Sequence, residues 1–407
     1  MRNEKCMVCI STRQNTANLI PFLQFNLDTM IILETDHAKK ENWSEGLRDV
    51  LKYKNKNVKQ YTIGAGTNLQ QMLDYIRDYV SGQSPVCWNI GGGQKMQQMA
   101  MTRVFQERLN QNFPDWACYA DPGTRKIFTI TGDMHNLQST EDVINTQITI
   151  DDVLTVFGLE KRQSNHPLLL WRADQPDNSP PPDIFRDISL FWNSSERRKI
   201  IDWVMTGEGD TPDVLVGLKH DYADYFEQVV QAEVIKILQK TFPDHHVTEA
   251  WANVRVKDTH GKEIAEWDIV LVTDFGTLII LDAKTGTFHS KDEHARLFNL
   301  ERATGVYGEF WLVIPYLLED IQDENFYAKY EKGKDIRKIP FDLSKLNSRF
   351  LAITGCNDPF YIKKGRKNKV TILQSQEGDI SGKNILKITD LSALLDRLRL
   401  KKTCPST

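Results

Sequence analysis

Two apolar segments in the second half of the chain carry charged residues that a simple hairpin does not need. Residues 266–272 (EWDIVLV) and 278–285 (LIILDAKT) have the length and composition of strands, and the segment 273–277 between them is typical of a turn. Asp268 lies in the first strand, and Asp282 and Lys284 lie in the second. The alternative is a half-buried hairpin whose charges face water. The clustering of the three charges favours a chemical role.

These three side chains suit metal-assisted cleavage of a phosphodiester. Carboxylates are the hard oxygen ligands that a divalent cation such as Mg²⁺ or Mn²⁺ prefers. Asp282 and Lys284 are two residues apart, so on a strand they point to the same face. The lysine would then lie beside the metal, where it can orient or deprotonate a water or stabilise charge on a phosphate. The pattern therefore predicts hydrolysis of a nucleic acid.

A helix with acidic residues precedes the hairpin. Apolar residues recur at helical spacing over 222–240, which predicts an amphipathic helix. At about 100° per residue, Glu233 falls near the middle of the apolar arc and Glu227 falls at its edge. Geometry alone makes Glu233 the more unusual carboxylate, and both remain candidates for the site.

Further elements follow Lys284 along the chain. The segment 291–302 is typical of a helix, and the apolar run 310–314 is typical of a strand. His289, His294 and Arg302 lie in or beside this helix, but a lone histidine is usually solvated or structural, so we leave them out of the predicted site. Two basic segments, 332–338 and 363–369, are either solvated loops or contacts for a nucleic acid.

The acidic helix, the Asp on one hairpin strand and the Asp-x-Lys on the next together resemble the PD-(D/E)xK nuclease core. The resemblance implies that Asp268, Asp282 and the carbonyl of Ala283 bind Mg²⁺ or Mn²⁺. It also implies that Lys284 positions the attacking water.

The same resemblance bears on the helix carboxylate. In these nucleases the acid usually follows an aromatic or aliphatic residue in the first turns of the helix, as Glu227 follows Phe226. The resemblance therefore favours Glu227 over Glu233, and it implies that Glu227 completes the metal shell or holds a metal-bound water.

The first half of the chain alternates strands and helices. Strands are predicted at 5–10, 29–33, 58–63 and 85–90, and helices at 19–26, 43–53 and 69–80. Repeated strand and helix units predict a doubly wound, mainly parallel sheet. Such sheets bind ligands beyond the carboxyl ends of their strands.

Two of these strand ends carry residues suited to an anion. The first predicted strand runs into the polar segment 11–15, and the fourth runs into three glycines, 91–93, followed by Lys95 at the start of a helix. Glycines let a ligand approach the backbone, a helix amino terminus offers free N–H groups, and Lys95 adds a cation. The spacing matches neither the dinucleotide fingerprint nor the P-loop. We therefore expect a phosphate-bearing ligand other than conventionally bound NAD or ATP.

The glycine loop resembles that of CARF domains, the CRISPR-associated Rossmann-like modules that sense cyclic oligoadenylates. The whole chain resembles the CARF-nuclease effectors of type III CRISPR defence, although Gln94 stands where that family often has Thr and Asp282 where it often has Glu. The resemblance implies a homodimer that binds cyclic tetra-adenylate and then cleaves single-stranded DNA or RNA, or supercoiled duplex DNA. The ligand pocket would be lined by Ser11, Thr12, Gln14, Asn89, Gly91, Gly92, Gly93 and Lys95.

A length of 407 residues predicts two or three domains. We expect an α/β protein with a Rossmann-like CARF ligand-sensing domain at 1–145 and a PD-(D/E)xK restriction-endonuclease-like α/β domain at 206–407. The region 146–205 is expected to be a linker with short helices. Within this region, the pattern of residues 149–158 predicts a helix capped by Thr149 or Asp151. The proline-rich composition of 172–183 predicts an extended connection.

Composition sets the remaining limits. A net charge of -4 means that any attraction for phosphate must come from local patches. Six scattered cysteines argue against a disulfide framework, and Cys6-x-x-Cys9 has no second pair to complete a zinc site. No apolar run reaches about 18 residues, and the first residues lack the apolar core of a signal peptide. These features predict a cytoplasmic protein that does not associate with a membrane.

Two alternatives stay open at this point. One is a restriction or repair nuclease whose first half is a docking domain and whose activity needs no cyclic nucleotide. The other is a ligand-sensing regulator that binds nucleic acid without cutting it. The intact set of Asp268, Asp282 and Lys284 argues against the second.

Overall fold

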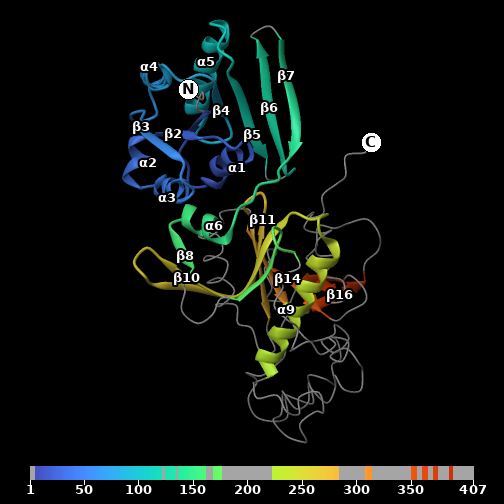
Figure 1. The fold of residues 1–407 in the computed structure, drawn as a ribbon. Helices are drawn as coiled ribbons and strands as arrows, with labels where there is room; N and C mark the ends of the chain where they lie inside the picture. The colour runs from blue at the N-terminus through green and yellow to red at the C-terminus, as the bar shows by residue number, and fades with distance from the viewer. Residues whose placement is uncertain are drawn as a thin grey trace, which may run out of the picture.

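The computed structural model describes residues 5–121, 124–133, 136–161, 168–176, 222–283, 308–313, 350–354, 360–364, 370–374 and 385–387. Within these residues the chain forms two main sheets, which lie one above the other in Figure 1. The structure does not describe Lys284, the predicted helix 291–302, the basic segment 332–338, most of 363–369 or the prolines at 180–182. In the described part of the chain, no helix combines the length and the apolar character needed to span a membrane.

The first sheet is mainly parallel, as predicted. Its described strands run in the order β3-β2-β1-β4-β5-β6-β7, and β1 to β5 are parallel whereas β6 and β7 form an antiparallel hairpin beside β5. The strands are β1 (Cys6–Ile10), β2 (Thr29–Glu34), β3 (Asn57–Thr62), β4 (Val86–Asn89), β5 (Trp116–Asp121), β6 (Lys126–Asp133) and β7 (Asn136–Val143). The helices are α1 (Thr16–Gln24), α2 (Asp36–Lys40), α3 (Glu45–Tyr53), α4 (Leu69–Val80) and α5 (Lys95–Asn110).

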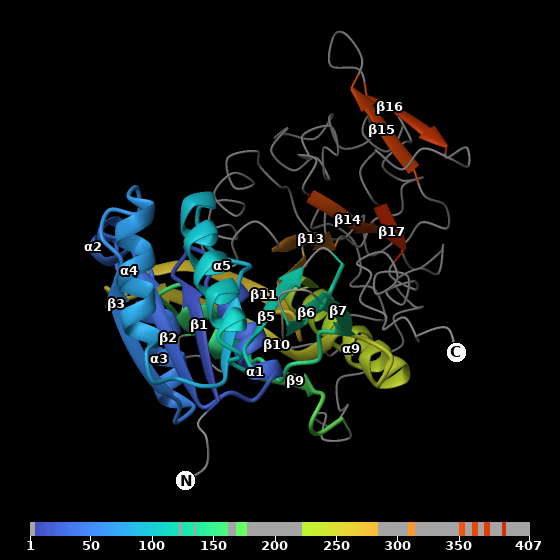
Figure 2. The same cartoon turned by 90° about the horizontal axis from the view of Figure 1, so that it is seen from above.

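Helices cover both faces of this sheet. In Figure 2, α4 and α5 lie on one side and α1 and α3 on the other. Every residue of β1 is buried, because alternate side chains pack against one helix layer and then the other. Cys6 packs on the α4 and α5 side and Cys9 on the α1 and α3 side, so the two thiols point apart.

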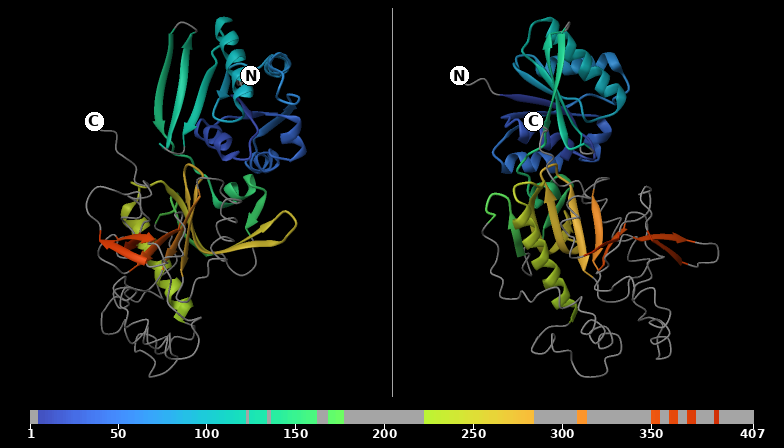
Figure 3. Two further views of the ribbon diagram at one scale, coloured as in Figure 1. Left: turned by 180° about the vertical axis from the view of Figure 1, so that it is seen from behind. Right: turned by 90° about the vertical axis from the view of Figure 1, so that its right-hand side faces the viewer.

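The second sheet has a different pattern. Its described strands run in the order β17-β14-β13-β12-β11-β10-β8, with β9 also paired to β10. The strands are β8 (Leu159–Lys161), β9 (Leu168–Arg172), β10 (Val247–Asp258), β11 (Glu263–Thr273), β12 (Leu278–Ala283), β13 (Glu309–Val313), β14 (Phe350–Thr354) and β17 (Ile385–Lys387). A separate hairpin pairs β15 (Phe360–Lys364) with β16 (Val370–Gln374). Helix α9 (Tyr222–Thr241) packs against β9, β10 and β12, as Figure 3 shows.

The segment expected to be a linker contributes to the second sheet. Besides the predicted short helix, α6 (Ile150–Val156), which Thr149 caps, it contains β8 and β9, and both strands pair with β10. The sequence did not predict these strands because they are short and owe their conformation to the long strand beside them.

The two sheets are joined by a shared core. One cluster of buried side chains contains residues of β1, α1 and α3 together with residues of α6, β10, β11 and β12. The contact between α3 and α6 is very close at Gly46, where a Cβ atom would lie only 2.0 Å from the carbonyl oxygen of Thr155. At the end of α3, Lys54 pairs with Asp152 of α6 at 2.9 Å. Helix α6 is therefore packed as part of the first domain.

A buried ion pair organises the centre of the first sheet. Arg108 of α5 lies 2.6 Å from Asp115, whose side chain is fully buried. Asp115 also accepts hydrogen bonds from the Trp88 indole at 2.9 Å and from the Val86 N–H at 3.0 Å. These contacts fix β4, and hence the glycine loop after it, against α5.

We expect Asp115→Ala to lower the free energy of unfolding by about 3–5 kcal/mol, because it leaves the Arg108 guanidinium buried without its partner. Asp74→Ala is the matched control: Asp74 is 60% exposed and pairs with Arg77 at the surface, so the cost should be about 0–1 kcal/mol. Urea denaturation followed by tryptophan fluorescence measures both. Equal losses for the two variants would contradict the importance of the buried pair.

Candidate functional site

The predicted catalytic hairpin is present, and it holds the two aspartates together. Strands β11 and β12 pair from Ile269 and Leu281 to Val272 and Leu278, and continuing this register places Asp268 opposite Asp282. Residues opposite one another in an antiparallel pair share a face. The Asp268 carboxylate accepts a hydrogen bond of 2.7 Å from the Ala283 N–H, which ties it to the backbone next to Asp282.

Both carboxylates are buried. Asp268 is 8% exposed and Asp282 is 1% exposed, and the buried residues 269–272 and 278–281 beside them are all apolar. Burying two carboxylates on opposite residues of a hairpin costs hydration and adds like-charge repulsion, which a bound cation would offset. The arrangement can hold a divalent metal through oxygen ligands.

The two helix candidates lie in different surroundings. Glu233 is 16% exposed and pairs with Lys236 of the same helix at 3.5 Å, which gives it a structural partner. Glu227 is partly buried on the same helix. Within the described residues, no three His, Cys, Asp or Glu side chains gather closely enough to hold a metal. The roles of Glu227 and of Lys284, which lies outside the described residues, stay predictions.

The predicted ligand loops meet at one point of the first sheet. Strands β2 and β3 continue to one side of β1, whereas β4 and β5 lie on the other, so the direction of the chain switches between β1 and β4. Ligands of open α/β sheets bind at this switch point. The two loops touch there: a Cβ atom on Gly92 would lie 3.2 Å from both the Ile10 carbonyl oxygen and the Thr12 methyl carbon.

The residues after β1 are arranged by hydrogen bonds. The Thr12 N–H donates to Asn15 at 3.0 Å, and the Thr12 hydroxyl accepts from the Gln14 N–H at 3.1 Å. Ser11 is 3% exposed, and its hydroxyl has no hydrogen-bond partner among the described residues. Lys95 is exposed at the amino terminus of α5, where a cation can meet an anionic ligand.

Asn89 has a different position from the one expected. We predicted that it lines the pocket, but its side chain is fully buried behind the glycine loop. Its amide donates to the Ala17 carbonyl at 3.1 Å and to the Asn18 side chain at 2.8 Å, and its oxygen accepts from the Gly91 N–H at 3.0 Å. Asn89 therefore holds the loop against α1 instead of facing a ligand.

One residue that sequence reasoning missed is Tyr119 of β5. It is 40% exposed, and its ring lies 3.2 Å from the position of a Cβ atom on Gly91. An exposed ring beside a backbone loop offers a surface on which a nucleobase can stack. The clue was present in the alternation of β5, where Tyr119 is the exposed residue between buried neighbours.

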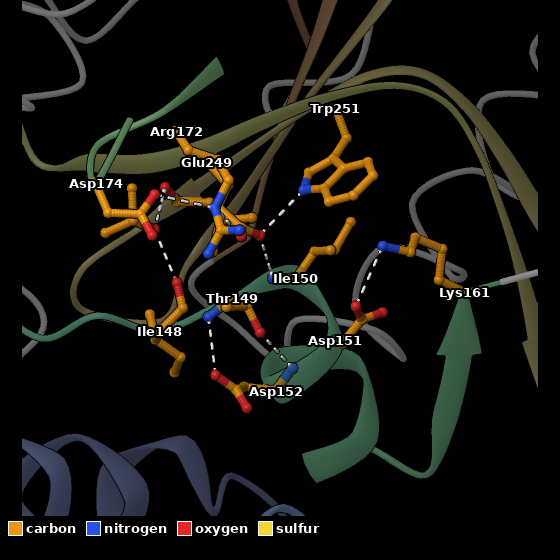
Figure 4. A network of polar contacts seen from close by, with 12 residues as sticks. Ile148, Thr149, Ile150, Asp151, Asp152, Lys161, Arg172, Asp174, Glu249 and Trp251 are labelled. Atoms are coloured by element: carbon orange, nitrogen blue, oxygen red, sulfur yellow. Dashed lines mark hydrogen bonds and ion pairs between the residues drawn. The ribbon is translucent and has the colours of Figure 1, made fainter. Parts of the chain in front are cut away.

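A polar network joins α6 to the second sheet (Figure 4). The Glu249 carboxylate of β10 accepts from the Ile150 N–H and the Trp251 indole, each at 3.0 Å, and lies 3.4 Å from Arg172. Burial raises the pKa of Glu249, and the hydrogen bonds and the charge of Arg172 only partly oppose this effect. The network anchors the start of α6, which packs on the first domain, to the sheet of the second.

The comparisons with known proteins find the same architecture. No family model and no curated protein matches the chain. Can2 from Sulfobacillus thermosulfidooxidans in complex with cyclic tetra-adenylate matches with a TM-score of 0.57 and 14% identity, over 80% of this chain and 92% of that one. VC1899 from Vibrio cholerae matches with a TM-score of 0.60 and 15% identity, over 97% of both chains.

A third solved structure is a type III CRISPR defence DNA nuclease activated by cyclic oligoadenylate. It matches with a TM-score of 0.55 and 13% identity, over 97% of this chain and 52% of that one. At such identities the likeness shows the fold. It confirms the predicted α/β architecture with its mainly parallel first sheet.

The raised pKa of Glu249 predicts a specific pH dependence. The folded state binds the proton of Glu249 more tightly than the unfolded state does. The stability that the folded protein gains from this proton is fully present below about pH 4.3, the pKa of a free glutamate. It is lost as the pH rises through the pKa of Glu249 in the folded state. We therefore expect the stability of Glu249→Gln relative to the wild type to increase from pH 4 to pH 7, in urea denaturation at each pH. The control Glu160→Gln alters a carboxylate that is 60% exposed and should show no such trend. A flat difference for Glu249→Gln would contradict the assignment.

Proposed function

We propose that this chain is a nuclease of type III CRISPR antiviral defence that is activated by a cyclic oligoadenylate, with cyclic tetra-adenylate as the expected activator. The observation that carries the proposal is the burial of Asp268 and Asp282 opposite one another on a hairpin. Two adjacent buried carboxylates are costly, and a cation-dependent reaction gives them a purpose. The fold shared with a cyclic-tetra-adenylate complex and with a cyclic-oligoadenylate-activated DNA nuclease supports this choice.

The residues of the hairpin fit a divalent metal such as Mg²⁺ or Mn²⁺. The donors are all oxygens: the carboxylates of Asp268 and Asp282 and the carbonyl of Ala283. The hydrogen bond from the Ala283 N–H orients Asp268 and increases the order of the donor set. When bound, the metal supplies Lewis-acid activation of the phosphodiester. Lys284 would orient the attacking water, and Glu227 would complete the shell.

The activator would bind where the loops after β1 and β4 meet. The glycines 91–93 would let the ligand approach the backbone, and the exposed Lys95 adds a positive charge that suits a phosphate of the ring. Ser11, Thr12 and Gln14 lie across the switch point, and Tyr119 offers a surface for a base. A two-fold symmetric ring suits a homodimer, because each subunit presents the same loops to it.

The substrate would be single-stranded DNA or RNA, or supercoiled duplex DNA. Binding of the activator can switch on cleavage only to the extent that the activator prefers the cleaving arrangement over the resting one. We therefore propose that the protein cleaves very little without its activator. Cleavage that needs no cyclic nucleotide would instead favour a restriction or repair nuclease.

Separate variants should divide the two activities. We expect Asp282→Asn to reduce activated cleavage by at least about 100-fold with unchanged activator affinity, because it removes a carboxylate ligand of the proposed metal, which supplies the Lewis acid of the reaction. Lys95→Ala should weaken activator binding by about tenfold or more, through loss of a charge-assisted contact, and leave the rate at saturating activator near that of the wild type. Titration of labelled DNA and RNA cleavage with cyclic tri-, tetra- and hexa-adenylate measures both. Wild-type behaviour of both variants would contradict the proposal.

Metal removal gives an independent measurement. We expect EDTA to abolish activated cleavage and added Mg²⁺ or Mn²⁺ to restore it, because the two aspartates would otherwise lack their cation. Binding of cyclic tetra-adenylate should not change, since the switch point and the hairpin use different residues. Full cleavage in EDTA would exclude a metal-dependent site.

A further inference from the structure

The turn of the catalytic hairpin is buried instead of facing water. Thr273 is fully buried, and Asp274, Phe275 and Thr277 are 2%, 6% and 6% exposed. Tips of hairpins normally lie at the surface, because loops are solvated. The burial of this turn shows that another part of the molecule is built to contact it.

The partner of the turn is the first domain. Gly276 adopts a positive φ of 72°, and a Cβ atom there would lie 3.4 Å from the terminal methyl groups of Ile20 and Ile148 and 3.6 Å from Thr16. The guanidinium of Arg125 lies 5.0 Å from the ring centre of Phe275, a cation–π contact. Thr16 and Ile20 belong to α1, and Arg125 immediately precedes β6.

Helix α1 is also connected to both predicted ligand loops, to one through the chain and to the other through hydrogen bonds. It begins directly after the loop 11–15. On the other side, Asn89 donates to the Ala17 carbonyl and to Asn18 in the first turn of α1, while it accepts the N–H of Gly91. One side chain therefore connects the glycine loop to α1, and α1 touches the hairpin turn.

The hairpin is suited to carry a displacement from its turn to its aspartates. The turn is closed by the hydrogen bond from the Thr277 N–H to the Thr273 hydroxyl, at 2.9 Å, and Asp274 contacts His246 of the second domain at 2.9 Å. From there β11 and β12 run paired to Asp268 and Asp282 at the other end. A movement of the turn would shift both carboxylates together.

We propose that Phe275 and Gly276 are positioning residues, through which the ligand loops, acting on α1 and Arg125, set the placement of Asp268 and Asp282. This inference rests on the proposed function and names the contact by which that function is regulated. It requires that the contact between the turn and the first domain differs between the resting and the activated state.

The test compares full-length variants on each side of the contact. Phe275→Leu removes the ring beneath Arg125, and Arg125→Gln removes the cation, while Arg125→Lys keeps a cation and should rescue. The controls are Phe105→Leu, a buried ring beside Trp88 in the α5 layer, and Lys126→Gln, whose partner is Glu141 of β7. For each protein we would measure the Kd for cyclic tetra-adenylate, the basal and activated kcat, the KM for labelled substrate and the Tm.

We expect Phe275→Leu and Arg125→Gln to lower the activated kcat by about tenfold, a typical coupling between two sites. The Kd, the KM, the basal kcat and the Tm should stay close to those of the controls. Because both variants break the same contact, the double variant should lose no more than either single one.

Three results would overturn the inference. The first is an activated kcat equal to that of the controls. The second is a fall in the basal kcat and the Tm that matches the fall in the activated kcat, which would indicate a purely structural role. The third is an activator that leaves the amide hydrogen exchange of residues 269–283 unchanged in the wild type. We expect the activator to alter exchange in these residues of the wild type, and in Phe275→Leu to alter exchange only in the first domain. A wild type that no cyclic oligoadenylate stimulates would instead refute the proposed function, and the inference with it.

Discussion

Burying two carboxylates opposite one another has an electrostatic cost, and the proposed chemistry of the second domain depends on this pair. Asp268 and Asp282 lie beside the buried apolar residues 269–272 and 278–281, and the Ala283 N–H donates a hydrogen bond to Asp268. A sheet that retains this cost has a reason outside its own stability, because apolar residues there would be more stable. The proposed cation chemistry supplies that reason, and it also explains why the hairpin must be held so firmly in its sheet.

In the first domain, the main feature is the way side chains order the glycine loop. In its proposed role the glycine loop has to admit a ligand and yet keep one shape, and short hydrogen-bonded side chains provide this order. Asn89 and Asn18 bind each other and the neighbouring backbone, so the loop is held in place by buried side chains. Rigid support beneath an exposed backbone is what recognition of an anion requires.

Much of this architecture was predictable from local pattern. Helix α4 was predicted with its observed bounds, because a helical apolar stripe follows Asn68, whose side chain caps it. The hairpin was predictable because two apolar runs of strand length flank a turn. Strands β8 and β9 were not, since their few residues carry no period and depend on β10. The position of Asn89 was also beyond the sequence: a polar residue after a strand suits a pocket or its support, and only tertiary contacts decide between them. The burial of the turn 273–277 likewise depends on α1, some 250 residues away in the sequence.

The close packing at Gly46 limits how the two domains can be exchanged with those of other proteins. Because α6 fits α3 with no space for even a methyl group, and continues into strands that complete the second sheet, the boundary between the halves is a shared structure and not a hinge. A foreign first domain grafted onto this chain at residue 145 would meet an α6 shaped for another surface. Functional chimaeras would need to exchange the first domain, α6 and the facing residues of the hairpin turn as one unit.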